Sequence, residues 1–168
     1  MRFPVVAFAL LCATCGLVSA QAPPVGVAQY EIVAIIDHPD SIYLSAMDVN
    51  NRGDVVGTCH PVGSHRQAGT GFRLRDGACE LITYPGAMNT VLSGTNSAGD
   101  IVGRAWFEGQ PQAVHFIYQR HQFAVIDIVG AEGPVSASVW DINDTGMISG
   151  HTRTADGREV GFLARRIR

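Results

Sequence analysis

The chain has 168 residues, 46% of them hydrophobic, and its 12 basic residues nearly balance 15 acidic ones, giving a formal net charge of −3. This balance, without a basic patch, disfavours nucleic acid and anionic membrane surfaces as partners. Glycine is abundant and lysine is absent. After the first twenty residues, glycine and proline interrupt every apolar stripe of helical period, which predicts an all-β protein.

The N-terminus has the pattern of a cleaved signal peptide over residues 1–20, which predicts an N-terminal signal helix. Arg2 supplies the positive charge, Phe3–Val18 is apolar, and Val18-Ser19-Ala20 is a small-residue cleavage site. The uncharged run of about 16 residues is shorter than the roughly 20 that a spanning helix needs. We therefore expect a secreted or periplasmic protein with no stable membrane span after cleavage, a leader over 21–29 and one domain over 30–168.

A glycine-rich phrase occurs three times, at Val49–Gly57, Thr95–Gly103 and Ile142–Gly150, in steps of 46 and 47 residues. Such a period predicts three antiparallel units. In each copy an asparagine begins a hairpin turn, one glycine takes the positive φ position, and a second glycine marks a bulge or a close backbone approach in the next strand. The predicted structural turn residues are Asn50, Gly53, Gly57, Asn96, Gly99, Gly103, Asn143, Gly146 and Gly150.

Further strands surround each phrase, and their order suggests how the ends of the domain meet. A strand with Phe72, Phe116 or Phe162 follows each phrase, and two of these lead into another strand. Tyr30–Ile36 has the same pattern as Phe123–Val129 but no such strand before it. We expect this first strand to pair beside the last strand and close a ring, removing exposed edges. The alternative is that the chain simply starts there.

The units, at about 30–77, 78–121 and 122–168, predict about twelve strands. Two architectures fit that number. One has propeller-like blades, and the other is a β-trefoil-like pseudo-threefold barrel. The glycines at fixed offsets favour blades, although three blades are fewer than the usual four to eight. A homo-oligomer, in which a second copy completes a larger ring, is therefore an open alternative.

The phrase N-x-x-G-D-[VI]-V-G, the Gly-Phe strand and the turn Pro85-Gly86-Ala87 resemble the extracellular HAF-repeat family of bacterial secreted proteins. The resemblance covers Tyr30 to Arg166, although His115-Phe116 lacks the alanine of the His-Ala-Phe signature. It implies a secreted or periplasmic β-repeat protein. It brings no catalytic residues to these positions.

Cys59 and Cys79 are the cysteines that remain after cleavage of the signal. In an oxidising compartment they predict one disulfide, which would close a loop of about 20 residues and stabilise the fold by about 3 kcal/mol. The competing interpretation is two free buried thiols, and the distance between the Cα atoms decides between them.

No enzyme, metal or cofactor site is predicted. The sequence has no G-x-S-x-G elbow, and Cys59, His60 and His65 match no structural zinc spacing. Asp48 and Asp141 occupy equivalent positions before their phrases, which favours a role in the turns over paired acid–base catalysis.

The remaining hypothesis is a non-catalytic binding or interaction module for an unknown protein or glycan. Function in such proteins is common in loops that differ between copies. Those loops carry His65, Trp106 and Arg153, which we take as the candidate ligand face, although Trp106 also fits a buried strand position. A structural or assembly protein is the second hypothesis, and a hydrolase using aspartates at strand ends is the third.

Overall fold

The computed structural model describes residues 28–63, 68–130, 133–134, 136–154 and 156–167. This part of the chain contains strands and turns but no helix, which confirms the all-β class. The predicted signal peptide and helix over 1–20, most of the leader and the candidate ligand residue His65 lie outside the described residues.

The chain divides into two compact units, residues 1–35 and 36–168. The described part of the first unit, residues 28–35, has no assigned strand, and Tyr30 and Val33 are 94% and 92% exposed. The prediction of a strand at Tyr30–Ile36 is therefore wrong for this structure. The alternating apolar pattern is present, but a strand also needs a neighbour for its backbone N–H and C=O groups.

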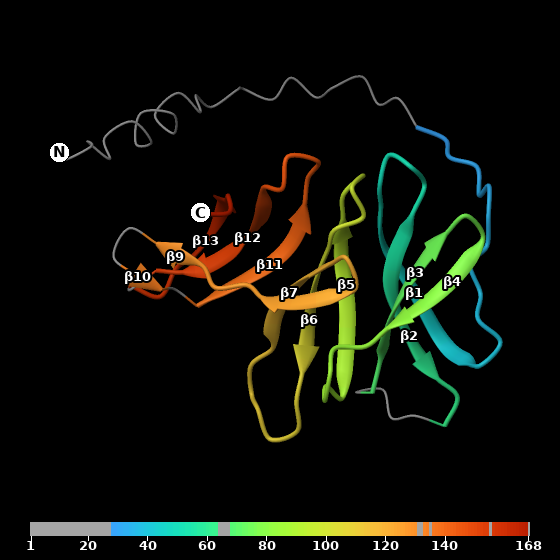
Figure 1. Cartoon of the computed structure of the whole chain (residues 1–168), viewed down its shortest axis with the longest axis horizontal. Coiled ribbons are helices and arrows are strands. Elements are labelled where there is room, and N and C mark those ends of the chain that lie inside the picture. The colour runs from blue at the N-terminus through green and yellow to red at the C-terminus, as the bar shows by residue number, and fades with distance from the viewer. Residues whose placement is uncertain (1–27, 64–67, 131–132, 135, 155, 168) are drawn as a thin grey trace. The chain divides into compact units, whose positions relative to one another are not determined.

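The second unit contains three larger antiparallel sheets and one two-stranded ribbon (Figure 1). The first sheet has the order β1 (Ser41–Val49), β2 (Val55–Pro61), β3 (Thr70–Arg75) and β4 (Ala78–Ile82). The second has β5 (Asn89–Thr95), β6 (Ile101–Trp106), β7 (Val114–Gln119) and β8 (Gln122–Val125). The third has only β11 (Ala137–Ile142), β12 (Ile148–Arg153) and β13 (Glu159–Ala164). The ribbon pairs β9 (Val129–Gly130) with β10 (Gly133–Pro134).

Each larger sheet is open, with an edge strand on both sides, so the described residues form no closed barrel. The β-trefoil-like alternative is therefore wrong. The sheets begin at residues 41, 89 and 137, each later than the start of the corresponding expected unit. The difference arises because the outer strands β4 and β8 pair backward onto the strand before them rather than forward onto the next hairpin.

A glycine and a phenylalanine face each other across the second and third strands of every larger sheet. The pairs are Gly57–Phe72, Gly103–Phe116 and Gly150–Phe162. A Cβ on Gly57 would collide with the Ser45 carbonyl oxygen and lie 2.7 Å from the Phe72 ring. Close approach therefore explains these glycines. The bulges lie in the partner strands β1, β5 and β11. These paired positions define equivalent residues in the three sheets.

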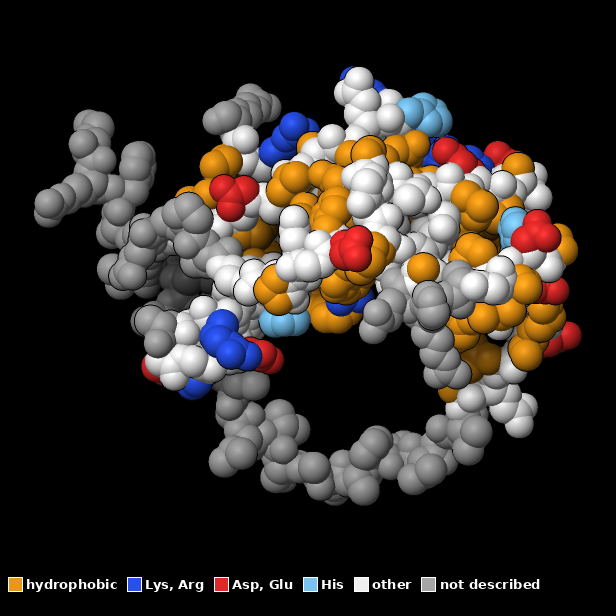
Figure 2. All heavy atoms as spheres, turned by 90° about the horizontal axis from the view of Figure 1, so that it is seen from below, with side chains coloured by type: hydrophobic (Ala, Val, Ile, Leu, Met, Phe, Trp, Pro, Cys, Tyr) orange, Lys and Arg blue, Asp and Glu red, His pale blue; other side chains and the backbone are white. Residues whose placement is uncertain are grey.

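Two apolar clusters join successive sheets. The first contains Ile82 from the first sheet with Leu92 and Phe116 from the second, all buried. The second cluster contains Val102 from the second sheet with Val139 and Ile142 from the third. Strand contacts agree with this order, since β5 packs against the first sheet and β11 packs against β5 and β6. Apolar side chains also reach the surface, where Figure 2 shows them among scattered charged groups.

Asparagine side chains link the three turns. Asn50 Oδ1 accepts hydrogen bonds from the backbone N–H groups of Arg52 and Asp54 at 2.9 and 3.0 Å. Its Nδ2 donates to the carbonyl oxygen of Asn96 at 2.9 Å, and Asn96 Nδ2 donates to the carbonyl oxygen of Asn143 at 3.2 Å. Each asparagine therefore shapes its own turn, and the first two also hold the next turn along the chain.

Cys59 and Cys79 are free thiols, so the predicted disulfide is not formed. Cys59 lies on β2 and Cys79 on β4, and β3 lies between these strands. Two strand spacings of about 4.8 Å place the backbones beyond the roughly 7 Å that a disulfide can bridge. The free-thiol alternative is half right, because Cys59 is buried and Cys79 is exposed.

Candidate functional site

The expected ligand face does not come together in the described residues. Trp106 ends β6 and is partly buried, and Arg153 ends β12 in a different sheet, where it pairs with Glu159 at 2.9 Å. Neither residue lines either of the two cavities described below. Trp106 and Arg153 therefore lie on different sheets, and the position of His65 relative to them is outside the described residues.

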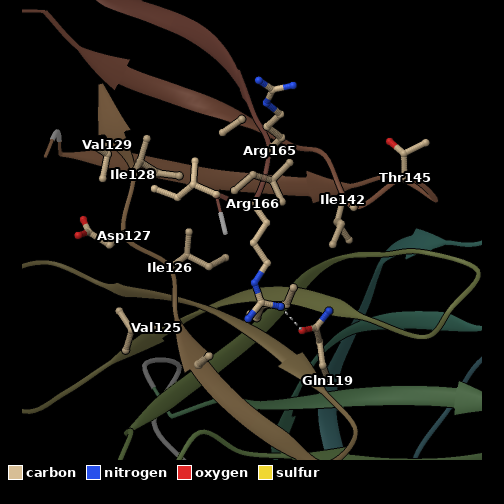
Figure 3. Close-up of a pocket in the computed structure, with 16 residues that line it drawn as sticks. Gln119, Val125, Ile126, Asp127, Ile128, Val129, Ile142, Thr145, Arg165 and Arg166 are labelled. Atoms are coloured by element: carbon tan, nitrogen blue, oxygen red, sulfur yellow. Dashed lines mark hydrogen bonds between the residues drawn. The ribbon is translucent and has the colours of Figure 1, made fainter. Parts of the chain in front are cut away.

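A groove of about 490 Å³ lies between the outer edge of the second sheet and the third sheet. Figure 3 shows Val125 to Val129 along one wall, and Ile142, Thr145 and Arg165 on the other side. Its lining is mainly apolar, with Ile126, Ile128, Ile142, Ile148, Ala164 and Ile167. A concave apolar surface of this size is large enough for side chains of a bound polypeptide.

The groove exists because the third sheet lacks two groups that fill the equivalent space between the first and second sheets. There, the Tyr118 ring packs against Phe123 with 4.7 Å between ring centroids, and the Phe123 centroid lies 5.2 Å from that of Phe116. Tyr118 pairs with Ile101, and the equivalent pair in the third sheet is Ala164 with Ile148. Alanine leaves the space of the tyrosine ring empty, and no fourth strand in the described residues supplies a counterpart of Phe123.

The edge strand β13 is open beside this groove. The first two sheets have four strands each, whereas the third ends at β13. Phe162 is only partly buried, while its equivalents Phe72 and Phe116 are fully buried. Leu163, also on β13, is 73% exposed. An edge strand of this kind presents unpaired N–H and C=O groups to any extended chain that approaches.

Polar groups stand at the mouth of the groove. Arg166 reaches across it and donates to Gln119 Oε1 at 3.5 Å, as the dashed line in Figure 3 shows. Arg165, beside it, is exposed, and Asp127 lies on the opposite wall. The two arginines make the end of the groove next to β13 positively charged, which favours an acidic residue in a bound segment.

A second cavity, of about 370 Å³, lies among the turns and contains Asp48 and Asp141. Asp48 Oδ2 accepts a hydrogen bond from the backbone N–H of Thr95 at 2.7 Å, so this carboxylate ties the first sheet to the second. Burial, together with the charge of Asp48, raises the pKa of Asp141. Among the described residues, no group of three or more His, Cys, Asp or Glu side chains is placed to hold a metal ion.

An arginine–aromatic cluster joins the second and third sheets. The Arg104 guanidinium lies 4.4 Å from the Trp140 ring centroid and 5.4 Å from that of Trp106. His115 Nδ1 accepts from the backbone N–H of Val139 at 3.2 Å. Burial, the positive charge of Arg104 and His151 lower the pKa of His115 to about 4. The contact between Arg104 on β6 and Trp140 on β11 therefore joins the two sheets, and Trp106, which is partly buried, lies beside Arg104 on the same strand.

The groove was not predicted from the sequence. Its central residue, Ala164, attracts no attention alone and becomes informative only when the strand register places it opposite the position of Tyr118. The signal that was available is the one already noted: a strand pattern at Tyr30–Ile36 without a preceding strand, and a last strand without a following one.

The fold and the groove define an all-β protein of separate antiparallel sheets, one of which has an open apolar edge. In the described part of the chain no helix has the length and apolar character needed to cross a membrane. No family model, curated protein or solved structure matches the chain.

Proposed function

We propose that the protein is a non-catalytic interaction module whose third sheet binds an extended polypeptide strand at β13. The observation that carries this proposal is the difference in strand number, because in the described residues two sheets have four strands and the third has three beside an apolar groove. The bound segment takes the place that β8 has in the second sheet.

The chemistry of recognition follows from strand addition. Backbone hydrogen bonds to β13 supply affinity without regard to sequence, and pockets for alternate side chains supply selectivity. Here one side chain of the bound strand enters the space above Ala164, where an aromatic ring fits best because Phe123 and Tyr118 fill the equivalent space. Arg165 and Arg166 favour a carboxylate next to that ring.

We further propose that the three larger sheets are propeller-like blades of a repeat protein that acts in the periplasm or outside the cell. Support comes from the shared strand order, the shared bulge position and the three turns with one set of backbone hydrogen bonds. The pattern of residues 1–20 supports secretion. The resemblance to the HAF-repeat family supports both.

A labelled peptide tests the binding site. The probe is a fluorescent peptide with the sequence of residues 122–129, which includes the fourth strand of the second sheet. It is titrated by fluorescence anisotropy against the full chain and against a Val33→Asp chain. The substitution places a charge in the apolar segment Tyr30–Ile36, so that this segment competes less well with the probe for the groove. We expect saturable binding to the Val33→Asp chain and no binding of a scrambled peptide.

Two substitutions assign the binding to the groove. Ala164→Arg fills the space beside β13 and should weaken binding of the probe at least tenfold. Ala78→Arg places the same side chain at an exposed position of β4, outside the groove, and should leave the affinity unchanged. Absence of binding to both chains, or equal loss in the two arginine variants, would contradict the proposed function.

A further inference from the structure

We infer that the strand bound at β13 is Tyr30–Ile36 of a second copy of this chain, so that two chains exchange these segments and form one closed ring of six larger sheets. This inference rests on the proposed function, because it names the occupant of the same edge. Four observations support it: the side-chain pattern of the segment, an open face on the first sheet, an unfinished series of hydrogen bonds between turns, and the number of sheets.

The first observation is the fit of the segment to the vacant position. In the second sheet, Phe123 pairs with Tyr118 and Val125 with Phe116. Tyr30–Ile36 follows the pattern of Phe123–Val129. Tyr30 would then pair with Ala164, and Ile32 with Phe162. The ring of Tyr30 would enter the space above Ala164, which is equivalent to the space that Phe123 fills in the second sheet.

The charges agree with the same register. Glu31 follows Tyr30 and would lie opposite Leu163, on the other face of the strand from the groove and on the same face as Arg165, two residues further along. Its equivalent in the first sheet, Glu80, pairs across strands with Arg73, whose position in the third sheet is taken by Leu163. The segment therefore brings an aromatic ring, an acid and a run of apolar residues in the order that the site accepts.

The second observation is an open face on the first sheet. Ile142 pairs with Ile148 at the face where the third sheet packs on the second, and Ile142 is 3% exposed. Val49 pairs with Val55 at the equivalent position of the first sheet, and Val49 is 61% exposed. The first sheet thus has an apolar face like the one by which the third sheet packs on the second. At Val49 no other residue of the second unit's described part covers this face.

The third observation is the series of asparagine contacts between turns. Asn50 donates to the Asn96 carbonyl oxygen, and Asn96 donates to that of Asn143. Asn143 is exposed, and its amide nitrogen has no acceptor among the residues that the structure describes. In a ring of two chains, this amide would donate to the carbonyl oxygen of Asn50 in the next copy and continue the series.

The number of sheets distinguishes a second copy from closure within one chain. The outer strand β4 leads into the inner strand β5 of the next sheet through only residues 83–88. Tyr30–Ile36 leads into β1 through a similarly short connection, residues 37–40. The sheet that receives Tyr30–Ile36 must therefore pack directly on the open face of the first sheet of the chain that donates the segment. Closure within one chain would make a ring of three sheets, below the usual four to eight, whereas two chains make six.

Sedimentation equilibrium of the full chain tests the stoichiometry. We expect the wild-type chain to have twice the mass of one chain. Val33→Asp places a charge where the equivalent residue, Ile126, packs between sheets, and it should yield a single-chain mass. Val62→Asp is the matched control, because Val62 is an exposed valine in a turn of the second unit, and it should remain dimeric. A monomeric wild-type chain at sub-millimolar concentration would overturn the inference.

Cysteine pairing tests the register and the exchange. Glu31→Cys and Leu163→Cys are made in separate chains, with every native cysteine except the buried Cys59 replaced by serine. In the proposed register these two positions are directly opposite, within disulfide reach. After the chains are mixed and oxidised, we expect a covalent dimer containing one of each. A third chain carries both substitutions. If a disulfide forms only within that chain and never between two chains, the segment pairs with β13 of its own chain, and exchange is refuted.

The two proposals can fail separately. If the peptide probe binds both the wild-type and the Val33→Asp chains, and neither chain dimerises, the groove binds strands but a second copy is not the occupant. If the probe binds neither chain and Ala164→Arg leaves the mass of the wild-type assembly unchanged, the groove is not a strand-binding site.

Discussion

The buried carboxylate of Asp54 in the first turn should make stability depend on acid pH. Its side chain is 5% exposed and accepts hydrogen bonds from Arg75 Nη2 at 2.7 Å, Asn50 Nδ2 at 3.0 Å and Arg52 Nη2 at 3.2 Å. The hydrogen bond from Arg75, aided by Asn50 and both guanidinium charges, lowers the pKa of Asp54 from 3.8 to about 2, although burial acts in the opposite direction. That difference corresponds to about 2 kcal/mol of stability.

Asp54→Asn is the matching perturbation, because an amide resembles the protonated carboxyl group in shape but carries no charge. A lowered folded-state pKa means that the ionised group stabilises the fold above about pH 4 and that this contribution disappears as the pH falls through about 2. We therefore expect the variant to be less stable than wild type by about 2 kcal/mol at pH 7, with the gap closing between pH 4 and pH 2.

Urea unfolding followed by tryptophan fluorescence measures this gap at each pH. Asp100→Asn is the control, since Asp100 accepts from Asn96 as Asp54 does from Asn50 but has no arginine within ion-pair distance in the described residues. It should cost less than Asp54→Asn. A gap for Asp54→Asn that stays constant from pH 7 to pH 2 would refute the assignment of the stabilisation to the ionised carboxylate.

Three further predictions concern other sites. The pKa of His115 is lowered from 6.5 to about 4, so the unfolded chain binds a proton at a higher pH than the folded chain does. Wild type should therefore lose stability relative to His115→Gln as the pH falls from about 6.5 to 4. Urea unfolding midpoints of both proteins at pH 7 and pH 4.5 measure this loss. Gly103→Ala should lower stability by about 2 kcal/mol through overpacking, whereas Gly161→Ala, with its nearest atom at 3.8 Å, should change the melting temperature little. Cys79 should react with a maleimide in the folded protein and Cys59 only in urea, as peptide mapping would show.

The all-β class could be predicted because glycine and proline spacing excludes long helices throughout the described residues. The role of the asparagines in the turns could also be predicted, because it depends on residues close in sequence: Asn50 Oδ1 accepts hydrogen bonds from two backbone N–H groups within four residues. The bulges were not predictable in position, because they lie in the strand opposite Gly57 and its equivalents and depend on pairing between segments.

Other features escaped prediction because they depend on neighbours in space. The pattern at Tyr30–Ile36 says which side chains alternate, but not whether a partner strand is available within the same chain. The spacing of Cys59 and Cys79 is compatible with a disulfide, yet the intervening β3 keeps them apart. The groove depends on the small side chain at Ala164, whose meaning appears only beside Tyr118.

The glycine that faces a phenylalanine in each larger sheet has a consequence for how such a chain can change over time. Because the Phe116 ring occupies the volume that a side chain on Gly103 would need, neither position can be altered freely without the other. A side chain on Gly103 would meet both the Phe116 ring and the carbonyl oxygen of Val91, so a substitution there carries a steric penalty. Duplicating a whole segment of the gene copies both partners together, which makes copying an easier route to new length or new surface than gradual remodelling of one sheet.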